Sequence, residues 1–422
     1  MHCTKTNKER FVLISIDKDQ EGERDLDELG LLIDTAGAME VGRIIQKREA
    51  MHPGHYMGKG KLDEVLELIV ETNADAVCAD DELSSSQQRN LAEKLGVKVI
   101  DRTMLILDIF AARASTAEGK AQVELAQYRY RISHLAGLGA QLSRQGGTAS
   151  QMGVGNKGPG EKKLELDRRH IRNRINQLSK ELREIKEMRG EARKRRLSNS
   201  CPIIALVGYT NAGKSTLLNV LTDAGVPAED KLFATLDTTT RKLPLEGGQE
   251  VLVTDTVGFI NKLPHNLIKA FHATLEELEF ASVLLHVVDV SAKDFKKQMH
   301  VVEETLKTLK IMDKPVITVL NKTDKIRPDE VFCPQNDCLG GTVVHISAKY
   351  GTGLDLLKKT IQDVLLSTSK KARILLPYSE GSLLSRIHST CKILFSENRD
   401  DGTYIELYAT DEIKAKTESF AL

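Results

Sequence analysis

A glycine-rich turn between an apolar run and a helix-forming run constrains the fold of this chain more than any other feature. Residues 208–215 read Gly-Tyr-Thr-Asn-Ala-Gly-Lys-Ser, after the apolar run 203–207 and before the run 216–221. Glycines let the backbone curl so that its N–H groups point at phosphate oxygens, and the N-terminus of a following helix adds partial positive charge. The pattern predicts a phosphate-binding loop, in which Lys214 bridges the β- and γ-phosphates and Ser215 ligates Mg²⁺. The residues of this loop expected to contact the nucleotide are Gly208, Tyr209, Thr210, Asn211, Ala212, Gly213, Lys214, Ser215 and Thr216.

A second motif adds to the phosphate side of the site. Asp255-Thr-Val-Gly258 follows the apolar run 251–254. The Asp255 carboxylate can hold Mg²⁺ through a water, and the Gly258 N–H can reach the γ-phosphate.

Two later motifs predict that the base is guanine. Asn321-Lys322-Thr-Asp324 follows the run 316–320. The Asp324 carboxylate can accept two hydrogen bonds from guanine N1 and N2, whereas adenine offers no matching pair of donors, and the Lys322 stem can lie across the base. Ser347-Ala348-Lys349 follows the run 343–346, and the Ala348 N–H can meet guanine O6. Both motifs lie where open α/β sheets bind ligands, at the carboxyl ends of strands.

Together the four motifs resemble those of the translation-factor class of small GTPase domains. Ras-like members carry a Gln after the Gly of the second motif to orient the attacking water. Phe259 stands there in this chain, which predicts slow intrinsic hydrolysis and a partner that accelerates it. The alternative is that Phe259 only packs, and both can hold. The groups expected to act in catalysis are Lys214, Thr235 and Gly258.

Thr235 and Asn211 are assigned by resemblance. The segment 233–240 contains four threonines, and its Phe-Ala-Thr-Leu run resembles the first switch of Obg-type GTPases, which favours Thr235 as a Mg²⁺ ligand beside Ser215 and Asp255. The alternative is that these threonines populate a mobile loop. In potassium-stimulated GTPases an Asn at the position of Asn211 helps to hold K⁺, and the alternative is an Asn that caps the loop.

The pattern of apolar runs predicts an α/β fold with several domains. Residues 10–115 and 201–365 alternate strand-like with helix-like runs, which indicates largely parallel sheets. In the first part we expect strands at 11–16, 39–46, 76–78 and 97–100 and helices at 25–36, 60–72, 84–95 and 103–112. In the second part we expect strands at 203–207, 251–254, 283–289, 316–320 and 343–346. The tail should contain strands at 373–376, 393–397 and 404–408 and a helix at 381–388. The expected domains are 1–116 (α/β), 117–197 (helical hairpin), 198–367 (GTPase) and 368–422 (small α+β).

The hairpin is predicted from two heptad seams. Apolar or small residues recur with alternating spacings of four and three from 121 to 142, and a second seam runs from 164 to 185. A non-helical glycine-rich loop, 145–160, joins them, and 193–200 is expected to be a linker. The chain has equal numbers of basic and acidic residues, 60 of each, but residues 161–196 hold 14 basic against 7 acidic ones. A basic hairpin of this kind suits RNA; the alternative is charge that only solvates a coiled coil.

Two classes of protein are not expected. No run of about 18 apolar residues exists, so no membrane span is predicted, and the N-terminus does not resemble a signal peptide. The six cysteines are scattered, which points to a reducing, cytoplasmic compartment. Cys333 and Cys338 lie near each other, but too few ligands surround them for a metal site.

Three segments outside the nucleotide motifs resemble the HflX family. They begin at His52-Pro-Gly-His-Tyr-Met-Gly-Lys-Gly-Lys61, at Asp101-Arg-Thr-Met-Leu and at Gly158-Pro-Gly-Glu-Lys-Lys-Leu-Glu165. The order of the domains matches as well. The family usually reads Thr-Gln where this chain has Lys162-Lys163.

The resemblance implies a ribosome-associated GTPase. Such proteins bind the large (50S) ribosomal subunit, split stalled 70S ribosomes under stress, and hydrolyse GTP faster on the ribosome. It implies Mg²⁺ as cofactor, GTP as substrate, contacts to ribosomal RNA through the basic hairpin and its glycine-rich loop, and a monomer off the ribosome. Two alternatives stay open: a GTPase for assembly of the large subunit, and a regulatory switch with a protein effector.

Overall fold

The chain divides by its internal contacts into two compact units, which are described separately. The first consists of Met1–Ile185 with Lys262–Phe271, and the second of Lys186–Asn261 with His272–Leu422. The computed structural model describes residues 8–18, 22–145, 159–197, 201–222, 225, 231–236, 238–246, 248–262, 278–326, 339, 341–367, 370–409 and 411–422. Most of the glycine-rich loop, Cys333 and Cys338 lie outside these residues.

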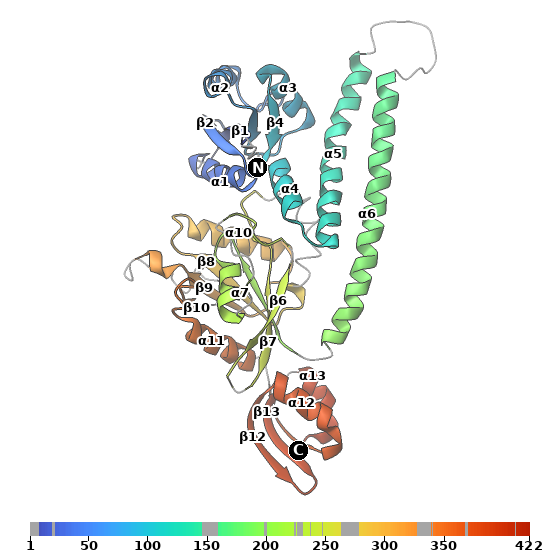
Figure 1. The fold of residues 1–422 in the computed structure, drawn as a ribbon, viewed down its shortest axis with the longest axis vertical. Helices are drawn as coiled ribbons and strands as arrows, with labels where there is room; N and C mark the ends of the chain where they lie inside the picture. Colours follow the sequence, from blue (N-terminus) through green and yellow to red (C-terminus); the bar gives the residue numbers. More distant parts are fainter. Residues whose placement is uncertain are drawn as a thin grey trace, which may run out of the picture. The chain divides into compact units, whose positions relative to one another are not determined.

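The first unit contains a parallel sheet of four strands in the order β2-β1-β3-β4 (Figure 1). The strands are β1 (Arg10–Asp17), β2 (Met39–Lys47), β3 (Ala76–Ala79) and β4 (Lys98–Asp101), and the helices between and after them are α1 (Gly22–Thr35), α2 (Lys59–Thr72), α3 (Ser85–Leu95) and α4 (Arg102–Arg113). Apolar side chains of α2 and α3, such as Val65 and Leu91, pack against Val12 and Val77 of the sheet. Every predicted strand and helix of this part is present, and the Ser84 side chain caps α3.

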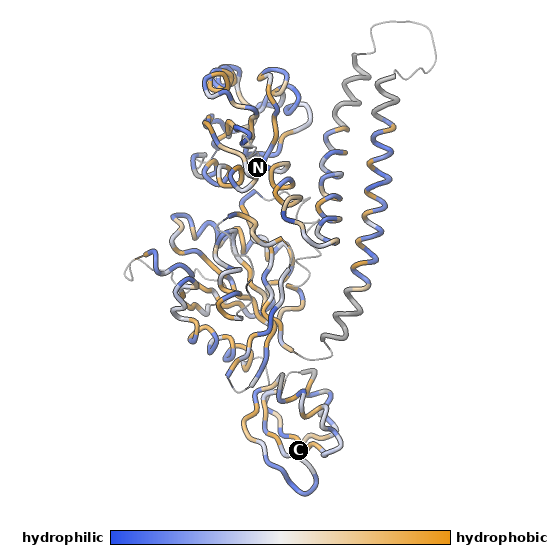
Figure 2. The backbone as a smooth tube through the Cα atoms, in the orientation of Figure 1, coloured by the Kyte–Doolittle hydropathy of each residue, from blue (hydrophilic) through white to orange (hydrophobic). Residues whose placement is uncertain are grey.

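Two long helices follow, α5 (Ala117–Gln145) and α6 (Pro159–Leu197). The two helices share an apolar cluster. It joins Ala121 and Leu125, near the start of α5, to Leu178 of α6. The Arg174 guanidinium donates to the Glu124 carboxylate over 2.8 Å. The predicted antiparallel hairpin is therefore present, and Figure 2 shows that the coloured middle part of α6 is mostly hydrophilic.

Two predicted bounds of the hairpin are wrong. The expected linker 193–200 is helical as far as Leu197, because Lys and Arg are good helix formers and nothing in this run breaks the helix. The expected non-helical loop extends too far, since α6 already begins at Pro159, where the fixed φ of proline suits the first helical position.

The second unit contains a six-stranded sheet in the order β10-β9-β8-β5-β7-β6. Its strands are β5 (Ile203–Gly208), β6 (Thr239–Pro244), β7 (Glu250–Asp255), β8 (Val283–Asp289), β9 (Val316–Asn321) and β10 (Thr342–His345), and its described helices include α7 (Lys214–Thr222), α10 (Phe295–Thr308) and α11 (Leu354–Ser367). All pairs are parallel except β6 with β7. The buried core joins strand residues such as Leu206 and Val319 to Leu217 of α7 and Ile361 of α11. This is the α/β fold, mostly parallel, that the sequence predicts.

The prediction missed strand β6, for which no strand was expected. Its sequence, Thr-Thr-Arg-Lys-Leu-Pro, buries only Leu243. An edge strand pairs on one side only and is commonly polar, so it lacks the apolar run by which the central strands are recognised.

A small antiparallel sheet of order β11-β13-β12 ends the chain. It consists of β11 (Lys370–Leu376), β12 (Lys392–Arg399) and β13 (Gly402–Ala409), with α12 (Gly381–Thr390) and α13 (Asp411–Thr417). The helix α13 was not predicted. The three sheets fall one in each of the expected domains 1–116, 198–367 and 368–422, whose bounds stay predictions.

Candidate functional site

The phosphate-binding loop lies at the one place where the order of the large sheet reverses. Strand β5 pairs with β7 on one side and with β8 on the other. Ligands of open α/β sheets bind outside the carboxyl ends of strands at such a point. Gly208 ends β5 and α7 begins at Lys214, so the loop between them occupies this position.

Two glycines of the loop are required by close approach. A Cβ on Gly208 would lie 2.3 Å from the Val287 carbonyl oxygen, and one on Gly213 would lie 2.3 Å from the Asn321 Nδ2. Gly213 also has a φ of 94°, which side chains rarely tolerate. The loop therefore presents backbone where other residues would present side chains.

Lys214 is buried inside this loop. Its ammonium donates to the carbonyl oxygens of Tyr209, over 2.7 Å, and of Gly208, over 3.1 Å. Burial lowers the pKa of Lys214 to about 8, against the opposing charge of Asp255. A phosphate bound in the loop would favour the charged form of the Lys214 ammonium, so the loop is suited to bind phosphate.

The three predicted Mg²⁺ ligands lie together. The Ser215 hydroxyl is 2.7 Å from the Thr235 hydroxyl and donates to Asp255 Oδ2 over 2.7 Å, and Thr235 donates to the same oxygen over 3.0 Å. Asp255 is fully buried, and its Oδ1 has no hydrogen-bond partner among the described residues. Burial raises the pKa of this carboxyl, which the Lys214 charge partly offsets. Hydroxyl and carboxylate oxygens around an unsatisfied buried charge fit a hard cation such as Mg²⁺.

Phe259, the residue after Gly258 of the second motif, is joined to the phosphate-binding loop through the backbone. The Thr210 N–H donates to the Phe259 carbonyl over 2.7 Å, and the Phe259 N–H donates to the Gly208 carbonyl over 3.1 Å. The Phe259 side chain is buried, so it packs and has no group that could orient a water. A Cβ on Gly258 would lie 2.9 Å from the Thr210 Cα, which explains glycine at this position.

Asn321 connects the phosphate side to the base side. It is buried at the end of β9, where its Nδ2 donates to the Ala212 carbonyl over 2.9 Å and its Oδ1 accepts from the Ala348 N–H over 3.0 Å. The Ala348 N–H, expected at guanine O6, is thus held by Asn321 here. Asn321 was expected to contact the nucleotide, but this bridging contact was not predicted.

The remaining base-side residues gather around the same edge. The Lys322 ammonium donates to the Asn211 carbonyl over 2.9 Å and lies 2.7 Å from Asp289 Oδ2. The Ser347 hydroxyl donates to Asp324 Oδ1 over 2.5 Å, which fixes one oxygen of that carboxylate.

Some neighbours of the site were not predicted. Asp289 was missed, although an acidic residue at the end of a predicted strand was the available signal. Lys349, the last residue of the predicted motif Ser347-Ala348-Lys349, is exposed, and its ammonium lies 5.1 Å from the centre of the Tyr350 ring. The residues lining the phosphate pocket are Thr210, Asn211, Gly213, Lys214, Ser215, Thr216, Lys231, Phe233, Ala234, Thr235, Thr256 and Gly258. Phe233, Ala234 and Thr256 lie within the predicted motifs but were not assigned a contact, and Lys231 belongs to no motif that could have marked it.

Two findings concern other kinds of site. None of the described helices is long and apolar enough to cross a membrane. No group of three or more His, Cys, Asp or Glu side chains in the described part of the chain could hold a metal ion.

Family models match three consecutive parts of the chain. Residues 23–111 match "GTP-binding GTPase N-terminal", residues 113–196 match "GTP-binding GTPase Middle Region", and residues 203–322 match "50S ribosome-binding GTPase". The third range contains the phosphate-binding loop, Asp255 and Asn321. The chain is therefore a GTP-hydrolysing enzyme.

Several curated relatives match nearly the whole chain. The chain is 49% identical to "GTPase HflX" of Lacrimispora saccharolytica, with 97% of this chain and 95% of that protein covered. It is 46% identical to "GTPase HflX" of Caldanaerobacter subterraneus subsp. tengcongensis, with 99% and 94% covered. For "GTPase HflX" of Escherichia coli (strain K12) the identity is 40%, with 94% and 92% covered. At these identities and coverages, the chain belongs to the HflX family of GTPases.

Proposed function

We propose that this GTPase binds the large (50S) ribosomal subunit and splits or rescues stalled 70S ribosomes, and that the ribosome stimulates its GTP hydrolysis. The observation that carries the proposal is the match of residues 203–322 to a family described as "50S ribosome-binding GTPase". The proposal places the protein in the cytoplasm, as a monomer when it is off the ribosome.

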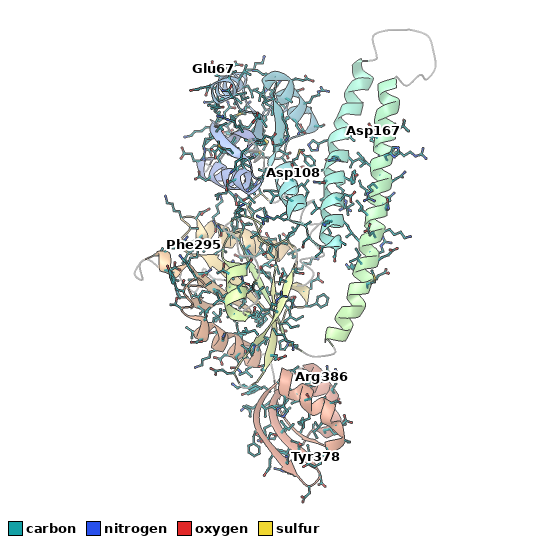
Figure 3. The ribbon with its side chains drawn as sticks, in the orientation of Figure 1. Glu67, Asp108, Asp167, Phe295, Tyr378 and Arg386 are labelled. Atoms are coloured by element: carbon teal, nitrogen blue, oxygen red, sulfur yellow. The ribbon has the colours of Figure 1, made fainter. Side chains whose placement is uncertain are left out.

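The hairpin supports a contact with ribosomal RNA. Helix α6 has 39 residues, so it is about 58 Å long at about 1.5 Å per residue. Arg169 and Arg172 are exposed on it, whereas Arg174 is engaged by Glu124. Figure 3 shows side chains projecting outward from this stretch of α6, near the labelled Asp167. Exposed arginines bind phosphates without reading sequence, which is what a ribosomal RNA contact requires.

The nucleotide site supports GTP hydrolysis that is slow until a partner accelerates it. Ser215, Thr235 and Asp255 would hold Mg²⁺, which neutralises charge on the β- and γ-phosphates when bound. Lys214 would contact the same phosphates, and Asp324 with Lys322 would hold guanine. Because Phe259 cannot orient a water, the accelerating group would come from the ribosome or from a rearrangement that the ribosome induces. Asn211 would help to hold K⁺ beside the phosphates.

The proposal is tested by sedimentation. Purified protein is mixed with 70S ribosomes and GTP, or a non-hydrolysable analogue, and resolved on a sucrose gradient. We expect conversion of 70S particles to subunits, with the protein on the 50S fraction. The double variant Arg169→Glu, Arg172→Glu should lose this association, while Lys359→Glu, an exposed charge on α11, should keep it.

The alternatives give different gradients. A large-subunit assembly factor would associate with precursor particles and leave 70S ribosomes intact. A regulatory switch with a protein effector would stay at the top of the gradient. Either result would overturn the splitting proposal while leaving the GTPase assignment in place.

A further inference from the structure

The three-stranded sheet at the end of the chain has two different faces. On one face Ile374, Ile405 and Leu407 pack against Ile387 of α12 and Ile413 of α13. Figure 1 shows both helices on this side of the sheet. Side chains alternate along a strand, so the intervening residues project from the opposite face. These residues are exposed or half-buried.

The register places a tyrosine between two lysines on this open face. Tyr408 of the central strand pairs with Lys371 of β11 on one side and with Lys392 of β12 on the other. The Lys371 ammonium lies 5.6 Å from the centre of the Tyr408 ring. One row across the sheet therefore combines an aromatic ring with two cations.

A second aromatic group lies two rows further along the same face. The rings of Phe395 and Tyr404 are 6.2 Å apart between centres and meet edge to face. Phe395 is 51% exposed, so its ring is open to solvent beside Tyr404. The Arg399 guanidinium lies 4.1 Å from the centre of the Tyr404 ring.

The charge of this surface is positive. The two acidic side chains of the strands each have an arginine partner, Glu406 with Arg373 over 3.1 Å and Glu397 with Arg399 over 3.1 Å. The open face holds four basic residues and two acidic ones, an excess of two: Lys371, Arg373, Lys392 and Arg399 against Glu397 and Glu406.

We propose that this open sheet face binds single-stranded RNA, with unpaired bases stacking on Tyr408 and Tyr404 and with Lys371 and Lys392 contacting the phosphates. Sheets that display aromatic rings beside cations bind single strands in this way, because every base has a face that can stack. Duplex RNA hides those base faces. A protein partner fits less well, since lysine is depleted from the buried centre of protein interfaces. The inference rests on the proposed function, which supplies RNA as the partner, and names a second RNA-binding surface besides the hairpin.

Cations that lie over the rings do not block this role. Exposed cation–aromatic contacts are weak, and stacking of a base on an aromatic ring is stronger. Lys371 and Arg399 are both exposed, so each can leave its ring and contact a phosphate as a base takes its place.

The absence of tryptophan from the sequence allows a direct test. Tyr408→Trp in the full chain introduces one reporter on the sheet face, and Val70→Trp introduces a control at a position that is 71% exposed on α2. Both are titrated with an unstructured oligouridylate RNA and with a duplex of the same length. We expect saturable quenching of the Tyr408→Trp fluorescence by the single strand, little by the duplex, and little in either case for Val70→Trp.

A second readout separates stacking from charge. Ultraviolet cross-linking to 5-iodouridine RNA should attach the wild-type chain at Tyr408, Tyr404 or Phe395. A third assay needs no tryptophan and measures binding of the single-stranded RNA by fluorescence anisotropy at low salt. Tyr408→Ala should weaken the affinity for this RNA by about fivefold or more, while Tyr408→Phe should retain it.

The proposal would be overturned by equal quenching at both tryptophan positions, by cross-links confined to the hairpin, or by wild-type affinity in Tyr408→Ala. Cross-links from this face to ribosomal proteins in place of RNA would also refute it. None of these results would touch the splitting activity on gradients, so failure of this inference is distinguishable from failure of the proposed function.

Discussion

Replacing Asn321 by alanine should uncouple the phosphate side of the nucleotide site from its base side. The side chain is 2% exposed and satisfies two backbone groups, the Ala212 carbonyl and the Ala348 N–H. Alanine would leave both groups buried without a partner. Each such group costs about 1–3 kcal/mol, so the free energy of unfolding of the GTPase domain should fall by about 2–6 kcal/mol. Affinity for guanine nucleotides should fall as well, because both loops lose their shared anchor.

The assay measures stability and binding separately. Urea unfolding followed by far-ultraviolet circular dichroism reports the first, and fluorescence of a mant-labelled GDP reports the second. Asn398→Ala is the matched control, because Asn398 is exposed and accepts one hydrogen bond over 3.2 Å; its effect should stay within about 0.5 kcal/mol. If Asn321→Ala unfolds and binds nucleotide as the wild type does, the bridging role is wrong.

Three further predictions concern the base, the metal and pH. Asp324→Asn should lower GTP affinity by about 100-fold or more and raise that for xanthosine triphosphate, as measured by competition against labelled GDP; retained tight GTP binding would refute the guanine assignment. Asp255→Asn keeps the shape of the side chain but removes its charge, so the Mg²⁺ concentration needed for half-maximal GTP turnover should rise by about 10–100-fold, and an unchanged requirement would exclude Asp255 from the metal site. Burial, with a smaller effect from the charge of Lys214, lowers the pKa of His286 from 6.5 to about 4. As the pH falls from 6.5 to 4, the unfolded chain binds a proton that the folded chain does not, so the folded state should lose about 3 kcal/mol over this window. Urea midpoints at pH 7 and 4.5 should show a smaller loss for His286→Leu, and parallel losses in both proteins would contradict this.

The sequence predicted the parts of the site that a local pattern specifies. The loop from Gly208 to Ser215 and the motif at Asp255 each follow a buried apolar strand, and the parallel sheet brings those strand ends to one edge. The oxygens of Ser215, Thr235 and Asp255 meet there, as the motifs suggested. Resemblance, not spacing, selected Thr235 from four candidates.

Other features depended on contacts between distant segments. The bridge of Asn321 to Ala212 and Ala348 spans 109 residues in one direction and 27 in the other, so no local pattern reveals it. Strand β6 was missed because a polar edge strand lacks an apolar run. The aromatic and basic face of the last sheet was missed because it depends on register: Tyr408, Lys371 and Lys392 are unremarkable until three strands align them in a row.

The measurement that tests the central claim most directly is the rate of GTP turnover by the purified full chain, alone and with 50S subunits, in K⁺ and in Na⁺. With Phe259 in place of a water-orienting side chain, the protein alone should turn over slowly. We predict a stimulation of about tenfold or more by 50S subunits, larger in K⁺ than in Na⁺ if Asn211 helps to hold the ion. An equal rate with and without ribosomal particles would contradict the account, because a GTPase that works on the ribosome would then gain nothing from binding it.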